Sequence, residues 1–240
     1  MPLRKVKPGS QMYQFLNDWP LEGANRGFTW NVIKGRCPDN DCKYCFMKVF
    51  QLSPRHFDSS ELKASLGEGN FIFVGSSNDV FSATVPADWI KRILEVCRAF
   101  PENRYLFQSK NPKRFSGLIN EFPEASIFGT TIETNRNFGE YLVSKAPPPY
   151  ERAHEMDFLS KYGYKVMITI EPLMDFDLEV LVGWMNNIQP EWINIGADSK
   201  GHHLPEPNDA KITQLVLKLH QNHKIILKSN LRRISDVSIQ

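Results

Sequence analysis

The chain has 240 residues, of which 41% are hydrophobic and 23% are charged, a composition that excludes a disordered protein and is sufficient for one large core. Its 29 lysine and arginine residues against 27 aspartate and glutamate residues give a net charge of +2, so any nucleic-acid site would have to be local. Every apolar run is shorter than the roughly 20 residues of a membrane span, and the N-terminus lacks the apolar stretch of a signal peptide. We therefore expect a cytoplasmic protein that does not interact with a membrane.

Residues 1–28 carry basic side chains with little periodicity, and we interpret them as an N-terminal arm that contacts phosphate or lies in solvent. Residues 29–240 alternate short apolar runs with helical patterns, which indicates β-α units around a parallel sheet within one domain. The predicted strands are Thr29–Ile33, Phe71–Val74, Tyr105–Phe107, Ile127–Thr131, Val166–Ile170, Trp192–Ile195 and Ile225–Leu227. Helical stripes cover Trp89–Cys97, Phe115–Phe122, Leu178–Met185 and Ile212–Leu219.

The residues before these stripes are typical of helix starts. Pro86 and Pro112 suit first helical positions, and Asn111, Asp177 and Asn208 suit N-caps. Six β-α units and a final strand are too few to close an eight-stranded barrel, but crossover handedness still curls them in the same direction. The sequence therefore predicts an α/β fold, a partial (β/α)6 TIM-like barrel with an additional C-terminal strand.

Three of the four cysteines, Cys37, Cys42 and Cys45, follow the first predicted strand with the spacing C-x4-C-x2-C. In the cytosol, cysteines are more often metal ligands or free thiols than disulfides. Three thiolates on one short loop suit iron or zinc and are one ligand short of the usual four. At an iron-sulfur cluster, the iron without a cysteine is where a small molecule would bind.

This loop resembles the cluster loop of the radical S-adenosylmethionine (SAM) superfamily. There, three cysteines, usually spaced C-x3-C-x2-C, bind a [4Fe-4S] cluster, and an aromatic or apolar residue, here Tyr44, precedes the last one; this chain has one extra residue in the first gap. The flanking T-W-N, Gly35 and K-Y-C-F are similar to the DNA-repair-photolyase-like branch and to a phage-associated branch of unknown substrate. The resemblance covers about Phe28 to Arg233. It implies a (β/α)6 fold, a [4Fe-4S] cluster and S-adenosylmethionine as cofactors, and an external electron donor.

Two other sites would use the same cysteines. A structural zinc site would need a fourth ligand, for which His56 is the nearest histidine. A plant-type ferredoxin cluster has this loop spacing and would need Cys97 as the distant fourth ligand. Cys97 lies on the apolar stripe of a predicted helix, where a cysteine most often packs as a small hydrophobic residue.

Functional side chains in parallel α/β folds gather at the C-terminal ends of the strands. The residues after the second strand are small and polar: Gly75, Ser76, Ser77, Asn78 and Asp79. They allow a ligand to approach the backbone and accept hydrogen bonds from an ammonium group. By location they correspond to the superfamily's glycine-rich segment that binds the methionine amino group, although Gly-Gly-Glu is absent. An ordinary tight turn is the alternative.

Lys110, Thr131 and Glu133 lie at the ends of the third and fourth strands, and we predict that they also bind SAM. Lys110 offers a positive charge for the carboxylate, and Glu133 offers an acceptor for ribose hydroxyls or the ammonium group. A lysine and a glutamate of the phage-associated branch look similar. Either residue could instead belong to a surface ion pair.

Glu171, Asp198 and Lys228 follow the last three strands and are the candidate catalytic residues. Glu171 ends a very apolar run, so its carboxylate needs a partner such as Lys228 or Lys110. It could serve the cofactor, the substrate or only an internal salt bridge. His202 and His203 lie in a glycine- and proline-bounded loop, and we interpret them as exposed and non-catalytic.

We therefore expect a radical SAM enzyme that cleaves SAM reductively to a 5′-deoxyadenosyl radical, which abstracts hydrogen from a substrate. A non-enzymatic iron-sulfur or zinc module that binds a partner is the alternative class. The substrate is either a nucleotide or nucleic acid, or a small metabolite. Basic and amide side chains near the strand ends favour the former: Lys110, Lys113, Arg114, Lys228, Arg232, Arg233, Gln108, Asn111 and Asn230.

Overall fold

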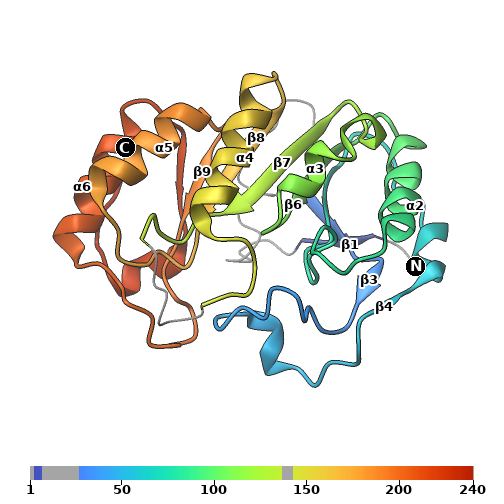
Figure 1. The fold of residues 1–240 in the computed structure, drawn as a ribbon, viewed down its shortest axis with the longest axis horizontal. Helices are drawn as coiled ribbons and strands as arrows, with labels where there is room; N and C mark the ends of the chain where they lie inside the picture. Colours follow the sequence, from blue (N-terminus) through green and yellow to red (C-terminus); the bar gives the residue numbers. More distant parts are fainter. Residues whose placement is uncertain (1–2, 7–26, 137–142, 240) are drawn as a thin grey trace.

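The computed structural model describes residues 3–6, 27–136 and 143–239, so most of the predicted N-terminal arm lies outside the described residues. The main element is an eight-stranded sheet in a mixed α/β fold (Figure 1). Its strands are β1 (Arg4–Lys5), β2 (Gly27–Trp30), β5 (Phe71–Val74), β6 (Arg104–Gln108), β7 (Ser126–Thr131), β8 (Lys165–Ile170), β9 (Ile193–Ile195) and β10 (Ile225–Leu227). Strands β1 and β10 lie at the two edges of the sheet.

The predicted strands are present and pair as parallel neighbours in chain order from β2 to β10. Strand β1 instead pairs antiparallel with β2, with Arg4 opposite Thr29. The parallel register sets the C-terminal residues of neighbouring strands side by side, for example Thr131 opposite Thr169. As a result, the polar residues that follow the strands meet at one end of the sheet.

The first predicted strand, Thr29–Ile33, is wrong at its C-terminal end. Strand β2 stops at Trp30, and the side chain of the next residue, Asn31, bonds to the turn after β5. Residues Ile33–Lys34 form a separate strand, β3, which pairs antiparallel with β4 (His56–Phe57) in a two-stranded sheet. The cysteines are therefore connected to this small sheet and not directly to the main one.

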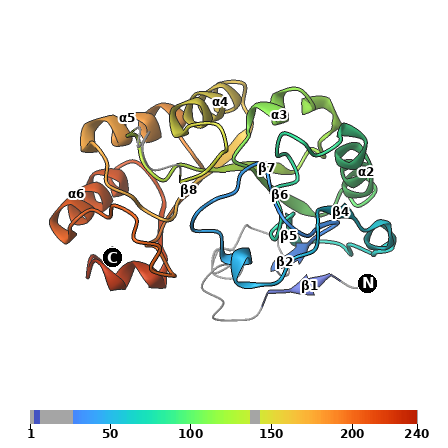
Figure 2. The same cartoon turned by 60° about the horizontal axis from the view of Figure 1, so that its bottom comes forward.

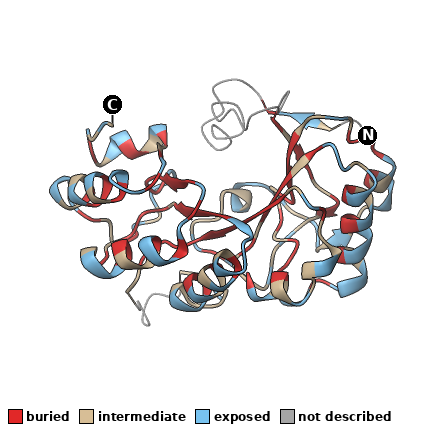
Figure 3. Cartoon of the chain, turned by 90° about the horizontal axis from the view of Figure 1, so that it is seen from above, coloured by how far each residue is buried: buried red, intermediate tan, exposed pale blue. Residues whose placement is uncertain are grey.

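Helices separate the strands of the main sheet. They are α2 (Ala87–Arg98), α3 (Lys113–Ser116), α4 (Pro149–Lys161), α5 (Leu178–Ile188) and α6 (Asp209–His220), with the 3-10 helices η1 (Phe46–Val49), η2 (Ser59–Lys63), η3 (Ile119–Glu121) and η4 (Ser229–Arg233). Figure 2 shows α2 to α6 following one another along one face of the sheet. Their buried residues face the strands and their outer sides are exposed (Figure 3).

The predicted helix Phe115–Phe122 is wrong, because it is broken in two. Helix α3 ends at Ser116 and is followed by Gly117, a poor helix former, before η3 begins. The rings of Phe115 and Phe122 still pack together, with centroids 5.9 Å apart, in an aromatic group that includes Phe128. The apolar spacing thus reflects aromatic packing between short elements.

The predicted helix starts differ in how well they match the structure. Asn208 is the N-cap of α6, and its side chain accepts a hydrogen bond from the backbone N–H of Lys211 at 2.9 Å, as predicted. Asp177 is at the N-cap of α5 without a side-chain bond. Pro86 and Pro112 are N-caps instead of first helical residues, so Asn111 lies before the cap of α3.

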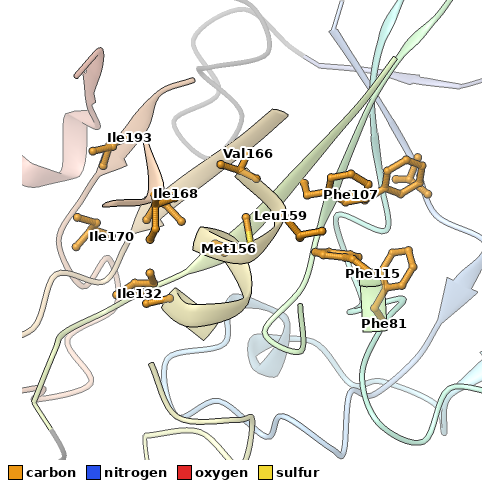
Figure 4. Close-up of a cluster of buried hydrophobic side chains, with 14 of the residues drawn as sticks. Phe81, Phe107, Phe115, Ile132, Met156, Leu159, Val166, Ile168, Ile170 and Ile193 are labelled. Atoms are coloured by element: carbon orange, nitrogen blue, oxygen red, sulfur yellow. The ribbon is translucent and has the colours of Figure 1, made fainter. Parts of the chain in front are cut away.

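The main hydrophobic core fills the space between the sheet and its helices. Figure 4 shows strand residues such as Phe107 and Ile168 facing helix residues such as Met156 and Leu159. A smaller cluster on the other face of the sheet contains Phe73, Leu106, Met167 and Trp192. Because both faces are packed beside the strands, the polar C-terminal ends are where a ligand site can form.

Candidate functional site

The cysteine loop runs from β3 to η1 and brings Cys37, Cys42 and Cys45 to one cavity of about 660 Å³. Cys42 is buried, Cys37 and Cys45 are partly exposed, and all three are free thiols. Burial raises the pKa of the Cys37 and Cys42 thiols above the ordinary value. A thiolate at these positions therefore needs a compensating cation, which a bound iron would supply.

Contacts with distant segments fix this loop. The side-chain amide of Asn40 donates to Asp79 at 2.7 Å, which ties the loop to the turn after β5. On the opposite side, the loop exchanges backbone hydrogen bonds of 2.7 Å with the segment 143–145. From that segment, the Ser144 hydroxyl donates to the Asn40 carbonyl at 2.8 Å and lies 3.3 Å from the Cys42 sulfur. The cysteines thus have neighbours that are remote in sequence.

Arg55 is a third support for the loop, and it had not been expected from the sequence. Its guanidinium donates to Asp39 at 2.8 Å, to Ser82 at 2.9 Å and to the Cys37 sulfur at 3.5 Å. Burial alone would raise the pKa of Asp39, but hydrogen bonds from Thr84 and Arg55 hold it well below its usual value. A positive charge beside the sulfur of Cys37 favours the thiolate needed for ligation.

The donor set fits a cluster that takes one thiolate per iron. Within the described residues, no group of three or more His, Cys, Asp or Glu side chains lies close enough together to hold a metal ion. Ligands of a multi-iron cluster bind different iron atoms and so lie further apart than the ligands of one ion. Three soft thiol donors at one cavity, with an adjacent cationic side chain, are consistent with that chemistry.

The two alternative ligands lie elsewhere in the structure. His56 is exposed on β4, with its ring nitrogen 3.0 Å from the Pro54 carbonyl. Cys97 is fully buried on the inner face of α2, where burial raises the pKa of its thiol well above the ordinary value. Neither is among the described residues that line the cavity with the three loop cysteines.

The turn after β5 forms a wall of the same cavity as the cysteines. Gly75 has φ +80°, and a Cβ atom there would lie 2.3 Å from a methyl carbon of Val80, so only glycine suits the position. The Asn31 side chain accepts from the backbone N–H of Ser77 at 2.8 Å and contacts the Ser76 hydroxyl at 3.1 Å. The sequence predicted this turn as a ligand site but did not identify Asn31 as its organiser.

The Asp79 carboxylate at this wall accepts hydrogen bonds from three donors of the protein itself. One carboxylate oxygen accepts from the backbone N–H of Phe81 at 3.0 Å. The other accepts from Asn40 at 2.7 Å and from the backbone N–H of Lys110 at 2.9 Å. Asp79 therefore joins the cysteine loop, the turn after β5 and the end of β6.

A buried charge network lies at the ends of β6 and β7. Glu133 forms ion pairs with Lys110 at 2.5 Å and with Arg152 of α4 at 2.9 Å, and it accepts a hydrogen bond from the Tyr44 hydroxyl. Burial alone would raise the pKa of Glu133, but Arg152 and Lys110 lower it far below its usual value. Burial and the Glu133 charge raise the pKa of Tyr44 well above normal. Arg152 is a partner that the sequence did not reveal.

A second polar group lies at the ends of β8 to β10. The Asn230 side chain donates to Glu171 at 2.7 Å and to the Ser199 hydroxyl at 2.7 Å, and Lys228 lies 3.7 Å from Glu171. Glu171 therefore has Lys228 as its partner, one of the two predicted. A Cβ atom on Gly196 would be 2.9 Å from the Glu171 carboxylate, so the glycine permits this approach.

His202 is partly buried and paired, whereas we predicted an exposed side chain. Its Nδ1 lies 2.6 Å from the carboxylate of Asp198, which is itself buried, and its backbone N–H donates to the same carboxylate at 2.5 Å. Hydrogen bonding from His202 lowers the pKa of Asp198 against the raising effect of burial. His203 is exposed, as predicted.

Most of the predicted cofactor-binding residues line the cavity, namely Gly75, Ser76, Ser77, Asn78, Asp79, Lys110 and Thr131. Tyr44, Glu133 and Glu171 are not among the described residues that line it. Among the basic residues predicted near the substrate, Arg114 donates to the Ser82 carbonyl at 2.6 Å, and Arg233 pairs with Glu206. These two guanidinium groups are thus engaged within the protein.

Several solved structures share this fold. A spore photoproduct lyase variant has a TM-score of 0.55 and 13% identity over 80% of this chain and 61% of that chain. A variant of the same enzyme with bound AdoMet and dinucleoside spore photoproduct has a TM-score of 0.53 and 11% identity over 81% of this chain and 61% of that chain. Streptococcus suis SuiB bound to S-adenosylmethionine has a TM-score of 0.54 and 10% identity over 82% of this chain and 49% of that chain.

These neighbours are radical SAM enzymes, so the predicted resemblance is confirmed at the level of the fold. The chain spans less than two thirds of the length of each neighbour. No curated protein matches its sequence. Among the described residues, no helix is long and apolar enough to cross a bilayer. A family model described as "Protein of unknown function (DUF5131)" matches residues 40–204, more than half of the chain, and the chain therefore belongs to that family.

Proposed function

We propose that the chain is a radical SAM enzyme whose [4Fe-4S] cluster is ligated by Cys37, Cys42 and Cys45. The observation that carries this proposal is that three free thiols and a turn of small residues line one cavity. When bound, the cluster and SAM supply reductive cleavage of the sulfonium to a 5′-deoxyadenosyl radical, which abstracts hydrogen from a substrate. The fold shared with two kinds of radical SAM enzyme supports the proposal.

The chain's own residues bind and orient the cofactors in this proposal. The backbone at Gly75 would leave room for SAM, and the Ser76 and Ser77 hydroxyls and the Asn78 amide oxygen, which line the cavity, would accept from its amino group. That oxygen of Asn78 is buried and has no hydrogen-bond partner among the described residues, while its amide nitrogen donates to the Gly35 carbonyl at 3.1 Å. A buried acceptor without a partner is unfavourable, so an ammonium donor would stabilise it.

We assign the other predicted ligands to the same cofactor as proposals. Lys110 and Thr131 line the cavity and would face the carboxylate and the ribose, with Asp79 beside them. Three predicted ligands would contact SAM from beside the cavity, namely Tyr44, Glu133 and Glu171. We also infer that the sheet is the partial (β/α)6 barrel of this superfamily, because its helices follow one another on one face. The cytosol, with an external electron donor, remains the expected setting.

The substrate is a separate proposal. One neighbour contains a dinucleoside spore photoproduct, and the cavity wall includes the basic residues Arg36, Lys48 and Lys145 together with the exposed Phe50. Basic side chains with an adjacent aromatic ring suit phosphates and an unstacked base. We therefore propose a nucleotide or nucleic acid, with a small metabolite as the alternative. Glu171, Asp198 and Lys228 remain the candidate catalytic residues.

Anaerobic reconstitution tests the central proposal. The parent protein, loaded with about four irons and supplied with reductant and SAM, should form 5′-deoxyadenosine, because the reduced cluster would cleave the sulfonium bond. The Cys45→Ala variant is the matched control and should form none. A fully loaded parent that forms no 5′-deoxyadenosine with nucleosides, oligonucleotides or small metabolites would support the non-enzymatic module instead.

A further inference from the structure

Four side chains from four segments meet behind the cysteine loop. Tyr44 comes from the loop itself, Lys110 follows β6, Glu133 follows β7 and Arg152 is on α4. One carboxylate oxygen of Glu133 accepts from Tyr44 and, at 2.5 Å, from Lys110. The other accepts from Arg152 at 2.9 Å, and Arg152 also donates to the Thr131 carbonyl. Both oxygens of Glu133 are therefore occupied by protein donors.

This network is buried, in contrast to most ion pairs on a protein surface. The side chains of Glu133 and Arg152 are 3% exposed and that of Lys110 is 11% exposed. Exposed pairs contribute little to stability, whereas removal of one partner from a buried pair leaves an uncompensated charge. Glu133 is the common partner of three donors, so the arrangement depends on it more than on any one of them.

The network acts on the cluster ligands through Tyr44. This residue lies between Cys42 and Cys45 in the sequence, so fixing its side chain fixes the backbone that carries both thiols. Its hydroxyl bonds to Glu133 and Lys110, and the Lys110 ammonium also lies 5.0 Å from the centre of its ring. Side chains that hydrogen-bond to metal ligands change metal affinity by roughly 10–100-fold when they are removed, and we expect a side chain that fixes the ligands' backbone to act in the same direction.

We propose that Glu133 is a positioning residue for the iron-sulfur cluster, which fixes the Cys42–Cys45 part of the loop through Tyr44 and is charge-balanced by Lys110 and Arg152. This proposal rests on the proposed cluster and refines the assignment of Glu133, whose primary role becomes ligand geometry rather than direct contact with SAM. Two cations against one carboxylate give the network itself a net positive charge.

The test compares Glu133→Gln and Tyr44→Phe with the parent after anaerobic reconstitution, without SAM. Both variants should lose iron to a chelator about tenfold faster than the parent or more, and Glu133→Gln should also shift the electron paramagnetic resonance spectrum of the reduced cluster. The chelated, metal-free protein gives an independent reading. In hydrogen exchange, peptides covering the Cys42–Cys45 part of the loop should exchange faster in Glu133→Gln.

Glu61→Gln is the matched control, because Glu61 is similarly buried and pairs with Lys34 at 2.8 Å outside the cysteine loop. It should reduce stability but leave iron release and the spectrum at parental values. If Glu133→Gln does not fold, Tyr44→Phe decides, since it removes only one hydroxyl. The double variant Glu133→Gln with Lys110→Met should regain part of the lost stability, because Arg152 still lacks its carboxylate, but not parental iron retention.

Parental iron release, spectrum and loop exchange in both Glu133→Gln and Tyr44→Phe would overturn the proposal, even with lowered thermal stability. Equal acceleration by Glu61→Gln would overturn it too, because the effect would then be a general loss of stability. Failure of the proposed function has a different signature. In that case the parent would retain its cluster in a Glu133-dependent manner but form no 5′-deoxyadenosine.

Discussion

Single cysteines in this chain have two different environments, which leads to opposite expectations on substitution. Changing Cys37, Cys42 or Cys45 to alanine should abolish the cluster's visible absorbance, because each thiol lines the cavity. Cys97→Ala should retain that absorbance and destabilise the fold by roughly 1–2 kcal/mol, because it removes one buried sulfur from the core. Absorbance spectra and thermal unfolding of the four reconstituted variants check both outcomes. Loss of the cluster in a folded Cys97→Ala protein would favour the ferredoxin alternative.

His223 predicts a pH dependence of stability outside the site. It is buried, its Nε2 lies 2.9 Å from Asn186, and burial lowers its pKa below the usual 6.5. The unfolded chain therefore binds a proton at this ring at higher pH than the folded chain does. Stability from this residue should be present near pH 7 and be lost as the pH falls from about 6.5 through the lowered pKa.

Melting temperatures of the parent and of His223→Gln, measured between about pH 7 and about pH 5, check this expectation. The melting temperature of the parent should fall further over that range than the melting temperature of the variant. His203→Gln is the control, because His203 is exposed. Identical pH dependence in the parent and in His223→Gln would show that His223 contributes nothing to acid sensitivity.

Among single residues, the sequence predicted the site positions that lie close to a strand end or close to one another in the chain. The cysteines and the turn at Gly75–Asp79 are local patterns, so their spacing was informative. The roles of Arg55 and Arg152 could not be predicted from local patterns. The residues next to each arginine in the sequence give no sign that its guanidinium contacts the site. The role of a buried cation is defined by partners far away in the chain.

Among the elements, the turn after β5 depends on Asn31, the residue directly after β2. The Asn31→Ala change removes the side-chain oxygen that accepts hydrogen bonds from Ser77 and Ser76, so the turn should lose its order. We expect SAM affinity of the reconstituted protein to fall by about tenfold, corresponding to about 1.4 kcal/mol. Isothermal titration under anaerobic conditions measures it.

The matched comparison is Asn208→Ala at the start of α6. It removes one cap bond to Lys211 and should destabilise the protein by about 1 kcal/mol without changing SAM affinity. Equal SAM affinity in the parent and in Asn31→Ala would remove the turn from the list of cofactor contacts. Lys110→Ala in the same titration tests the predicted carboxylate contact separately.

Strands were easier to predict than helices in this fold. Buried parallel strands are continuous apolar runs, and β5 to β10 stand out for that reason. The helix Phe115–Phe122 was wrong because aromatic packing and helical periodicity give similar spacing, and only Gly117 indicated a break. The first strand was wrong beyond Trp30 because the turn after β5 engages the Asn31 side chain.

Over the whole molecule, the small net charge means that any nucleic-acid contact has to be local, and we propose that it lies at the cavity. Lys48 and Lys145 line the cavity and both pair with Asp41, at 2.8 Å and 3.0 Å. If the substrate is a polymer, single-stranded oligonucleotides should bind the reconstituted protein, with an affinity that falls steeply as salt rises. Changing both lysines to glutamine should weaken binding several-fold at low salt.

Lys218→Gln is the control, since Lys218 is a partly exposed lysine paired with Glu179 between α6 and α5. Fluorescence anisotropy over a salt series measures all three proteins. An absence of oligonucleotide binding at low salt would exclude a polymer substrate and leave a mononucleotide or a small metabolite.

The order of the strands in the sheet could be predicted from the sequence because βαβ units follow one rule of handedness. The contacts that close the site could not, since they join segments that no local rule relates.

The contacts between the cysteine loop and the segment 143–145 also determine when the site can form. The Cys42–Ser144 contact joins residues 102 positions apart, and the Asn40–Ser144 bond spans 104 positions. During synthesis at about 5–20 residues per second, the three thiols would therefore leave the ribosome several seconds before the segment that shelters Cys42. Contacts of such long sequence separation form late in folding. Iron loading is thus expected to follow the assembly of β2 to β7 with the segment 143–145, and a newly made chain would depend on reducing conditions during that interval.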